Sequence, residues 1–289
     1  MRGLAEFIMR GPRQAAFVAM LFTAIPMLFW LGAAVVALVT LRLGLERGLA
    51  VLVWAIIPAL GWWLGLQDPG AVIVLVSTLV MAMVLRTTVS WNKTLVTGAV
   101  IGIGLGALAP LLMSGLIDTL MQMADQIFRE LAKNAETEYD QTTQDAFRVM
   151  MIASFAASFF AMSMTALFIA RSWQSHLYNP GGWKQEFHHL RLQPLTVMGW
   201  LVAAMAARYV GVEPVVVLLV GWVAVVACGF ALVHGLIAKK QLGGQWLFGF
   251  YFLVVMLFPT VLMLLTCLVI VDSLIDIRSR VKPSPNVTQ

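Results

Sequence analysis

Residues 214–233 read PVVVLLVGWVAVVACGFALV and contain no Asp, Glu, Lys or Arg. A helix of this length rises about 30 Å, which matches the hydrocarbon thickness of a bilayer. A helix on the surface of a soluble protein needs a polar face, and this stretch has none. The stretch therefore predicts a transmembrane helix, and the rest of the chain can be read against it.

Comparable stretches recur throughout the 289 residues, of which only 11% are charged. Soluble domains carry about 25% charged residues. Eight stretches lack Asp, Glu, Lys and Arg altogether: 14–41, 48–67, 69–85, 94–117, 149–170, 192–207, 214–233 and 241–271. We predict an all-α, polytopic transmembrane helical bundle that forms a single domain, residues 1–289, with about eight spans.

Two of these stretches, 14–41 and 241–271, are too long for one straight crossing. Each has a proline near its middle, Pro26 and Pro259. Each is therefore either one tilted and kinked helix or two short helices in a hairpin. The number of spans consequently lies between eight and ten.

The distribution of Lys and Arg predicts the orientation, because cytoplasmic loops are enriched in both residues. If residues 42–47 face the cytoplasm, the other loops on that side carry Arg86, Lys93, Arg171, Lys184, Arg191, Lys239 and Lys240. We expect a multi-pass protein of the bacterial cytoplasmic (inner) membrane with its N-terminus in the cytoplasm, which requires 14–41 to enter and return. The side of the C-terminus depends on 241–271 and stays open.

Two polar segments lie between the spans. Residues 115–147 are acidic and extracytoplasmic in this topology. Within them, 116–132 has the apolar spacing of an amphipathic helix, and 133–147 reads as a loop. Residues 171–193 form a basic, aromatic cytoplasmic loop that suits lipid headgroups or a docking partner.

Small residues recur at helical spacing in two spans. Gly98, Gly102 and Gly106 share one helix face and would let another helix approach closely. Helix packing is the favoured interpretation, and a gating hinge is the alternative. Ala15 and Ala19 form a second, weaker pair of the same kind.

The sequence lacks the motifs of several functional classes. No phosphate-binding loop is present, and no charged residue lies in the middle of a span, where ion relays need one. His188 and His189 are adjacent, so they do not share a helix face as paired metal ligands would. We expect no enzymatic activity, no catalytic, cofactor-binding or metal-binding residues, and no nucleic-acid partner.

Short motifs along the chain resemble those of YybS-like bacterial inner-membrane proteins, a family of uncharacterised function. They comprise Arg42 and Gly44 in RLGLERG, Arg86 in MVLR, His234 in VHGL, and Asp272, Asp276 and Arg278 in DSLIDIR. The family is distantly similar to the substrate-binding subunits of energy-coupling-factor transporters. The resemblance implies a separate ATPase and scaffold module as partners, with Ala15 and Ala19 as the docking pair.

Two hypotheses for function follow. In the first, the protein is a substrate-binding subunit of a small-molecule transporter, with an outward-opening pocket covered by 116–147. In the second, it is a membrane scaffold that positions partner proteins or lipids through 171–193 and the amphipathic helix. Membrane lipids are partners in both.

Overall fold

The structure is a computed structural model that describes residues 2–134 and 140–282. These residues form helices and no strand. In chain order the helices are α1 (Arg2–Ile8), α2 (Pro12–Ala24), α3 (Phe29–Leu43), α4 (Leu45–Leu66), α5 (Gly70–Thr88), α6 (Trp91–Leu112), α7 (Ser114–Asn134), α8 (Gln141–Tyr178), α9 (Gly182–His188), α10 (Pro194–Ala206), the 3-10 helix η1 (Ala207–Val210), α11 (Pro214–Lys239), α12 (Gly244–Met256), α13 (Phe258–Ile275) and α14 (Ile277–Arg280).

The predicted fold class is confirmed: the chain is an all-α polytopic bundle. Within the described residues, six helices are long and apolar enough to cross a membrane, namely α4, α5, α6, α8, α11 and α13. Shorter apolar helices span Phe29–Leu43, Pro194–Val210 and Gly244–Met256. The finer count of eight to ten crossings stays a prediction.

Helix boundaries follow from local chemistry. Proline occupies the first turn of α2, α10 and α11, where its missing N–H costs no hydrogen bond. Asp140 caps α8 by accepting a hydrogen bond from the Thr143 amide at 2.9 Å. Gly44 separates α3 from α4 at a φ of 97°, a conformation that favours glycine.

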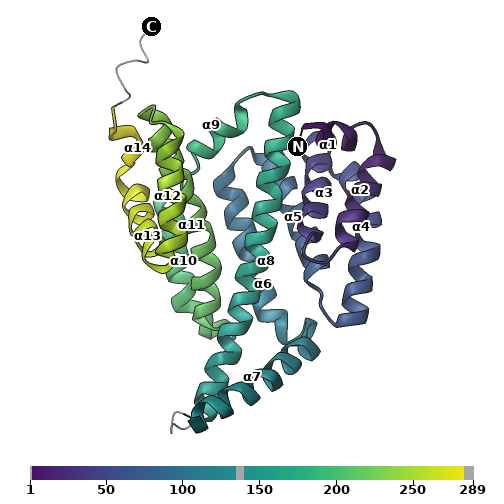
Figure 1. The fold of residues 1–289 in the computed structure, drawn as a ribbon, viewed down its shortest axis with the longest axis vertical. Coiled ribbons are helices and arrows are strands. Elements are labelled where there is room, and N and C mark those ends of the chain that lie inside the picture. The colour runs from purple at the N-terminus through teal and green to yellow at the C-terminus, as the bar shows by residue number, and fades with distance from the viewer. Residues whose placement is uncertain (1, 135–139, 283–289) are drawn as a thin grey trace.

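The two ends of the bundle differ in charge. Figure 1 places α1, α9 and α14 at one end and α7 at the other. The first end, called the basic face below, also carries the α3–α4, α5–α6 and α11–α12 connections, with most of the Lys and Arg residues. The opposite end carries the α4–α5 loop, α7 and η1, and is called the acidic face. The connections predicted to alternate between the two sides of the membrane therefore lie alternately at the two ends of the bundle.

Both long apolar stretches fold as hairpins, which resolves the alternatives left open by the sequence. Residues 14–41 form α2 and α3, with Pro26 in the turn between them. Residues 241–271 form α12 and the larger part of α13, whose first turn contains Pro259. Because each hairpin begins and ends at the basic face, α1 and α14 lie at the same end of the bundle (Figure 1).

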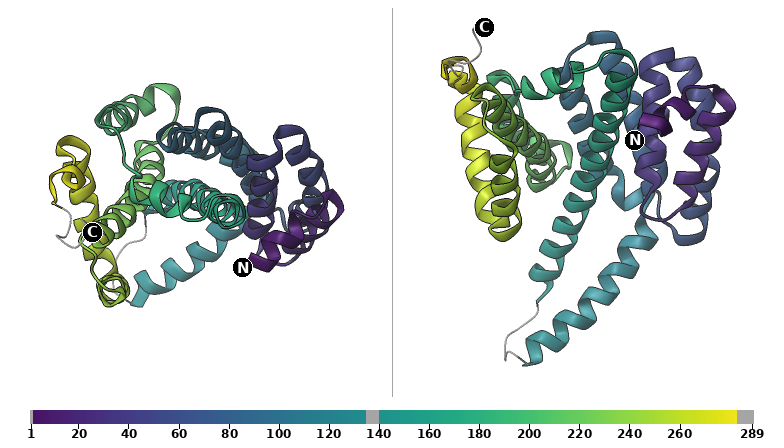
Figure 2. Two further views of the ribbon diagram at one scale, coloured as in Figure 1. Left: turned by 90° about the horizontal axis from the view of Figure 1, so that it is seen from above. Right: turned by 45° about the horizontal axis from the view of Figure 1, so that its top comes forward.

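The core forms around α3 and α8. Every residue of α3 from Gly32 to Leu41 is buried, because α2, α4, α5 and α8 surround this helix. Helix α8 packs against α3, α5, α6 and α11. It lies between the N-terminal and C-terminal helices in the view from above (Figure 2). At about 1.5 Å per residue, its 38 residues extend well past a bilayer core.

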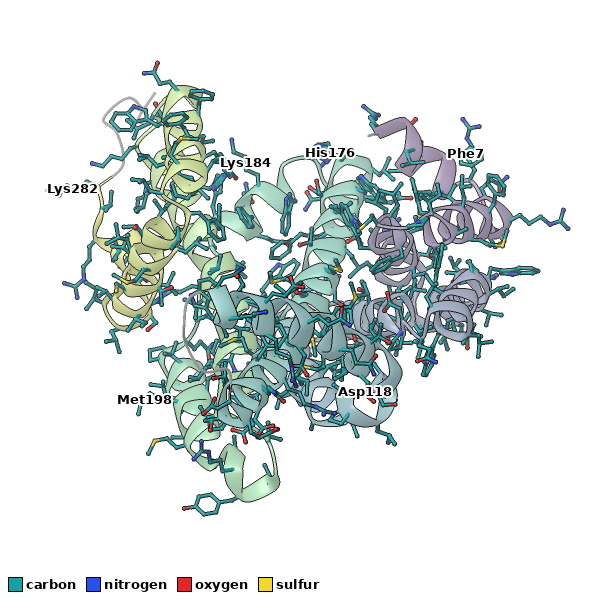
Figure 3. All side chains as sticks on the ribbon, turned by 60° about the horizontal axis from the view of Figure 1, so that its bottom comes forward. Phe7, Asp118, His176, Lys184, Met198 and Lys282 are labelled. Carbon is teal, nitrogen blue, oxygen red and sulfur yellow. The ribbon has the colours of Figure 1, made fainter. Side chains whose placement is uncertain are left out.

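The outer helices expose apolar side chains, as lipid contact requires. Helix α12 has no buried residue. Met198 on α10 points away from the bundle (Figure 3). These side chains would be unfavourable in water and are compatible with hydrocarbon.

Two sequence-based boundaries are wrong. The loop predicted for 133–147 is largely helical, because α7 extends to Asn134 and the Asp140 cap starts α8 at Gln141; residues 135–139 lie outside the described residues. The loop predicted for 171–193 contains the last two turns of α8, a turn at Asn179–Gly182, and α9. The amphipathic helix expected over 116–132 is confirmed as α7.

Candidate functional site

A buried carboxylate organises the basic end of α13. Asp272 is 2% exposed. Its Oδ2 atom lies 3.7 Å from Arg278 Nη2 and 3.8 Å from Arg191 Nε. Its Oδ1 atom accepts a hydrogen bond from the Ile277 amide at 2.9 Å, where the chain leaves α13. One carboxylate therefore caps the turn and lies between two guanidinium groups, whose combined charge it offsets only in part.

Asp276 has a parallel role four residues later. It adopts a left-handed conformation, with φ 51°, and its carboxylate accepts a hydrogen bond from the Ser279 amide. Its Oδ2 atom lies 3.4 Å from Arg191 Nη1. Arg191 also donates to the backbone oxygens of Asp272 and Ser273, at 3.0 and 2.9 Å. The segment before α10 is thus fixed to the end of α13.

Arg278 connects three helices. Its Nη1 donates to the His188 carbonyl at 2.8 Å, and its own carbonyl accepts from Lys239 Nζ at 2.7 Å. Its Nε and Nη2 atoms are buried without a hydrogen-bond partner among the described residues, although Nη2 faces Asp272. Burial lowers the pKa of the guanidinium, and the adjacent Asp272 carboxylate opposes that shift.

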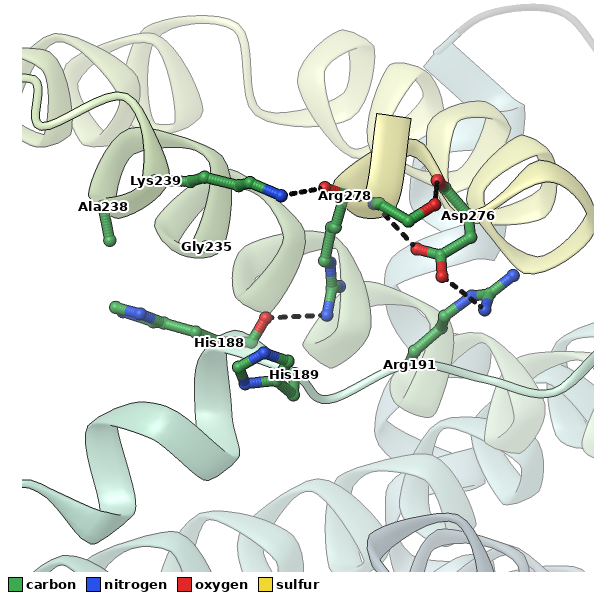
Figure 4. Close-up of a pocket in the computed structure, with 9 residues that line it drawn as sticks. His188, His189, Arg191, Gly235, Ala238, Lys239, Asp276 and Arg278 are labelled. Carbon is green, nitrogen blue, oxygen red and sulfur yellow. Dashed lines mark hydrogen bonds and ion pairs between the residues drawn. The ribbon is translucent and has the colours of Figure 1, made fainter. Parts of the chain in front are cut away.

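These side chains surround a cavity of about 590 Å³, shown in Figure 4 and called the α9–α11–α14 pocket below. Small-molecule sites have volumes of about 300–1,000 Å³. The pocket is lined by His188, His189, Arg191, Gly235, Ala238, Lys239, Asp276, Arg278 and Ser279. Three permanent cations and one carboxylate line it, so the lining carries a net positive charge.

The pKa of His188 reflects its partial burial and the positive charge around the pocket. Its pKa is lowered, first by partial burial and then by the positive charges of Lys184, His234, His189 and Arg278. The imidazole therefore resists protonation in the free protein. An anion in the pocket would offset the cationic field and favour the protonated form.

The motif residues Arg42, Gly44 and Arg86 gather at the end of α3, on the basic face. Arg86 Nη1 donates to the Leu41 carbonyl at 2.5 Å, which neutralises the negative C-terminal end of that helix. A Cβ on Gly44 would lie 3.8 Å from Arg86 Nη2. The Arg42 guanidinium lies 4.2 Å from the Tyr178 ring centroid. This second cluster connects the end of α3 to α5 and α8.

A third cluster holds α9 against the bundle. Arg171 forms an ion pair with Glu186, which also accepts a hydrogen bond from Trp91 Nε1 at 3.1 Å. Trp183 and Phe187 pack against Phe168 at centroid distances of 5.2 and 5.8 Å. The predicted interaction loop is therefore largely packed into its own protein.

His234 takes part in the same aromatic packing. Its Nδ1 lies 2.8 Å from the Phe230 carbonyl, and its Nε2 lies 3.2 Å from the Tyr251 hydroxyl. Its ring packs against Phe187. It does not line the α9–α11–α14 pocket, unlike the neighbouring Gly235.

The glycine face of α6 lies against two neighbouring helices. A Cβ on Gly98 would lie 2.3 Å from the Phe160 ring of α8, and one on Gly106 would lie 2.5 Å from Val216 of α11. On Gly102 a Cβ would be 3.0 Å from Val220. Glycine at these positions lets α6 pack closely against α8 and α11.

Ala15 and Ala19 are also packing residues. Both are buried, at 1% and 0% exposure. A Cβ on Gly32 of α3 would lie 2.9 Å from the Ala19 carbonyl. Helix α2 turns this pair toward its own bundle, and a role of the pair in docking a partner subunit stays a prediction.

The pocket residues His188, Arg191 and Lys239 were not singled out from the sequence as site residues, although Asp276 and Arg278 were. His188 and Arg191 lie three residues apart at the end of α9 and just after it, and folding brings Lys239, at the end of α11, next to them. A usable signal existed: each flanks a span on the same predicted side. Within residues 2–134 and 140–282, no group of three His, Cys, Asp or Glu residues is arranged to hold a metal ion.

Comparisons of the chain with protein-family models, with curated proteins and with solved structures give no match.

Proposed function

We propose that the protein binds an anionic small molecule in the α9–α11–α14 pocket, as the substrate-binding subunit of a membrane transporter. The observation that carries this proposal is the pocket lining. Arg191, Lys239 and Arg278 face a cavity of about 590 Å³ that contains a single lining carboxylate. Such a lining favours a phosphate or carboxylate group.

The internal ion pairs leave cationic capacity for a ligand. Asp272 and Asp276 are both engaged with backbone amides and with Arg191, so neither carboxylate can fully neutralise the remaining cations. Two nitrogens of Arg278 lack hydrogen-bond acceptors among the described residues. A ligand oxygen that reached them after a small shift of the side chain would satisfy buried donors, which is favourable.

The ligand would approach from the cytoplasm. The basic face is the cytoplasmic one by the distribution of Lys and Arg, in a bacterial inner membrane. The pocket lies at this face, and not at the outer face beneath 116–147 as the sequence suggested, since α7 contributes no lining residue. The side is checked by labelling Gly3→Cys and Asp68→Cys with a membrane-impermeant thiol reagent on intact cells. Asp68→Cys should react and Gly3→Cys should not; the reverse pattern refutes the orientation.

The transporter role rests on the YybS-like motifs and on the lack of an energy-supplying motif. Asp272, Asp276 and Arg278, three of the motif residues, build or support the pocket. An ATPase and a scaffold subunit would supply energy. Affinity purification in mild detergent should recover an ATPase with the protein; repeated recovery of the protein alone would argue against the transporter role.

The binding test is a calorimetric titration of the purified protein with inorganic phosphate and with small mono- and dicarboxylates. We expect saturable binding of at least one anion class, weakened about tenfold in Lys239→Gln, because a charge-assisted contact contributes about 1.5–3 kcal/mol. Lys93→Gln removes an exposed cation from the same face and should bind as the wild type does. Equal losses in both variants, or no saturable binding, would refute the site.

The scaffold hypothesis is favoured by one observation, the exposed apolar side of α7. Met123, Ile127 and Leu131 recur every four residues and are each more than half exposed. Photocrosslinkers at Ile127 should capture a defined protein if α7 is a docking helix. Capture of lipid alone would indicate an interfacial helix and reject this alternative.

A further inference from the structure

The basic ends of α2 and α4 enclose an apolar groove. One cavity, of about 280 Å³, is lined by Ile8, Met9, Gly11, Pro12, Ala15, Val39, Leu43, Arg47 and Val51. A second, of about 310 Å³, is lined by Pro12, Arg13, Ala16, Phe17, Met20, Ala50, Val51 and Trp54. The two cavities share Pro12 and Val51 and are therefore adjacent, with Arg47 lining the first and Arg13 the second; together they are called the α2–α4 groove below.

Charge and apolar surface are separated along this groove. Arg13 and Arg47 lie in the first turns of α2 and α4, at the basic face. The lining then continues past them to Met20 and Trp54, each about 10 Å further along its helix, without another charged residue. The groove thus has a cationic mouth and an apolar body.

The cations at the mouth have no internal counter-charge. No carboxylate among the described residues lies within ion-pair distance of Arg13 or Arg47. The amides at the start of α2 also lack a side-chain cap, which adds partial positive charge at the same place. In contrast, Arg191 and Arg278 in the α9–α11–α14 pocket face Asp272 and Asp276.

The geometry points to a binding site for one anionic phospholipid, with its phosphate between Arg13 and Arg47 and an acyl chain along α2 and α4. The mouth lies where lipid phosphates lie if the apolar helices span the bilayer, and the body lies at acyl-chain depth. Phe17 and Trp54 are both more than half exposed at the side of the groove, so a chain could enter laterally from the bilayer. This site is separate from the proposed anion pocket and does not depend on it.

Native mass spectrometry of the full chain in mild detergent tests the site. The probes are dioleoyl phosphatidylglycerol and dioleoyl phosphatidylcholine, which share acyl chains and differ in net charge. We expect one tightly retained phosphatidylglycerol, preferred about tenfold or more, since each cation near a lipid headgroup contributes about 1 kcal/mol. Glycerol phosphate alone should not displace it, because it lacks the chain.

Two variants separate headgroup from chain. Arg13→Gln combined with Arg47→Gln should abolish the preference for phosphatidylglycerol and leave weak binding of both lipids. Ala50→Trp adds bulk at an exposed lining position and should weaken both lipids about tenfold. Lys93→Gln, on the same face but outside the groove, should behave as the wild type does. Each variant is first checked for an unchanged melting temperature.

Other outcomes overturn the site. If Lys93→Gln loses the preference as fully as the double arginine variant, the face attracts anionic lipid without a defined site. If Ala50→Trp has no effect, or glycerol phosphate competes as well as lipid does, no chain occupies the groove. A lipid-free dimer that buries α2 and α4 would identify a second copy of the chain as the occupant.

Discussion

The two apolar hairpins, α2–α3 and α12–α13, have the same sequence signature but opposite environments. Both are long, free of charge and interrupted by proline. In the first, α3 is buried from Gly32 to Leu41, and Trp62 donates to the Thr23 carbonyl at 3.1 Å. In the second, α12 has no buried residue, and α13 buries Leu262, Leu265 and Val269 and, at its basic end, Asp272, which faces its arginine partners.

This difference shows that hydropathy alone cannot distinguish a helix that faces protein from one that faces lipid. Hydrocarbon and a protein core are similarly apolar, so association in the membrane depends on close packing and on polar contacts. The first hairpin uses small residues to achieve close packing. The second uses buried charges at one end and a hydrogen bond from Trp222 to Thr266, 2.9 Å long, within the membrane.

The largest expected effect comes from removing the buried charge that fixes the second hairpin. Asp272→Ala would leave Arg191 and Arg278 without their shared carboxylate and should cost about 3–5 kcal/mol of stability. Chemical unfolding in detergent measures the loss. Asp276→Ala is the matched control, since its side chain is 41% exposed and should cost much less. Equal losses would show that the network does not depend on burial.

A smaller effect should come from altering the close packing of the first hairpin. A Cβ at Gly32 would lie 2.3 Å from Thr23 Oγ1, so Gly32→Ala should destabilise the protein by about 1–3 kcal/mol. Gly249→Ala in α12 meets nothing within 4 Å and should be neutral or slightly stabilising, because alanine favours helix. Thermal unfolding of both variants compares the hairpins directly. Similar melting temperatures would contradict the contrast between them.

The smallest expected effect is the pH dependence of stability that His188 contributes at the basic face. Because the pKa of His188 is lowered in the folded protein, the folded state binds fewer protons than the unfolded state near the usual value of 6.5. Its contribution to stability is therefore complete above that value and decreases as pH falls below it. The melting temperature should decrease slightly more from pH 7.5 to 5.5 in the wild type than in His188→Gln. A steeper decrease in the variant would contradict a lowered pKa for His188.

The membrane-helix architecture could be predicted because a helix that crosses the hydrocarbon needs about 20 residues without charge, and such stretches are visible in the sequence. Pro26 marked the turn of the first hairpin, and Gly98, Gly102 and Gly106 marked a face of α6 that lies against α8 and α11. The prediction of a loop at 133–147 failed, because the Asp140 cap starts a helix within this polar sequence.

The pocket could not be predicted as a site. Lys239 is separated along the chain from His188 and Arg191, and their convergence depends on how α9 crosses α11. At that crossing, a Cβ on Gly235 would lie 2.8 Å from the His188 carbonyl. A short-range sequence pattern carries no information on such a crossing, because it is determined by tertiary packing.

Helix α8 reaches both faces of the bundle. Its 38 residues form one continuous rod, from the Asp140 cap on the acidic face to Arg171 and Tyr178 on the basic face. Near its start, the Phe147 ring packs against Phe128 of α7, with the ring centroids 5.1 Å apart. Its other end is paired with Glu186 of α9, whose last residue lines the anion pocket. A single continuous helix therefore contacts α7 at the acidic face and α9 at the basic face.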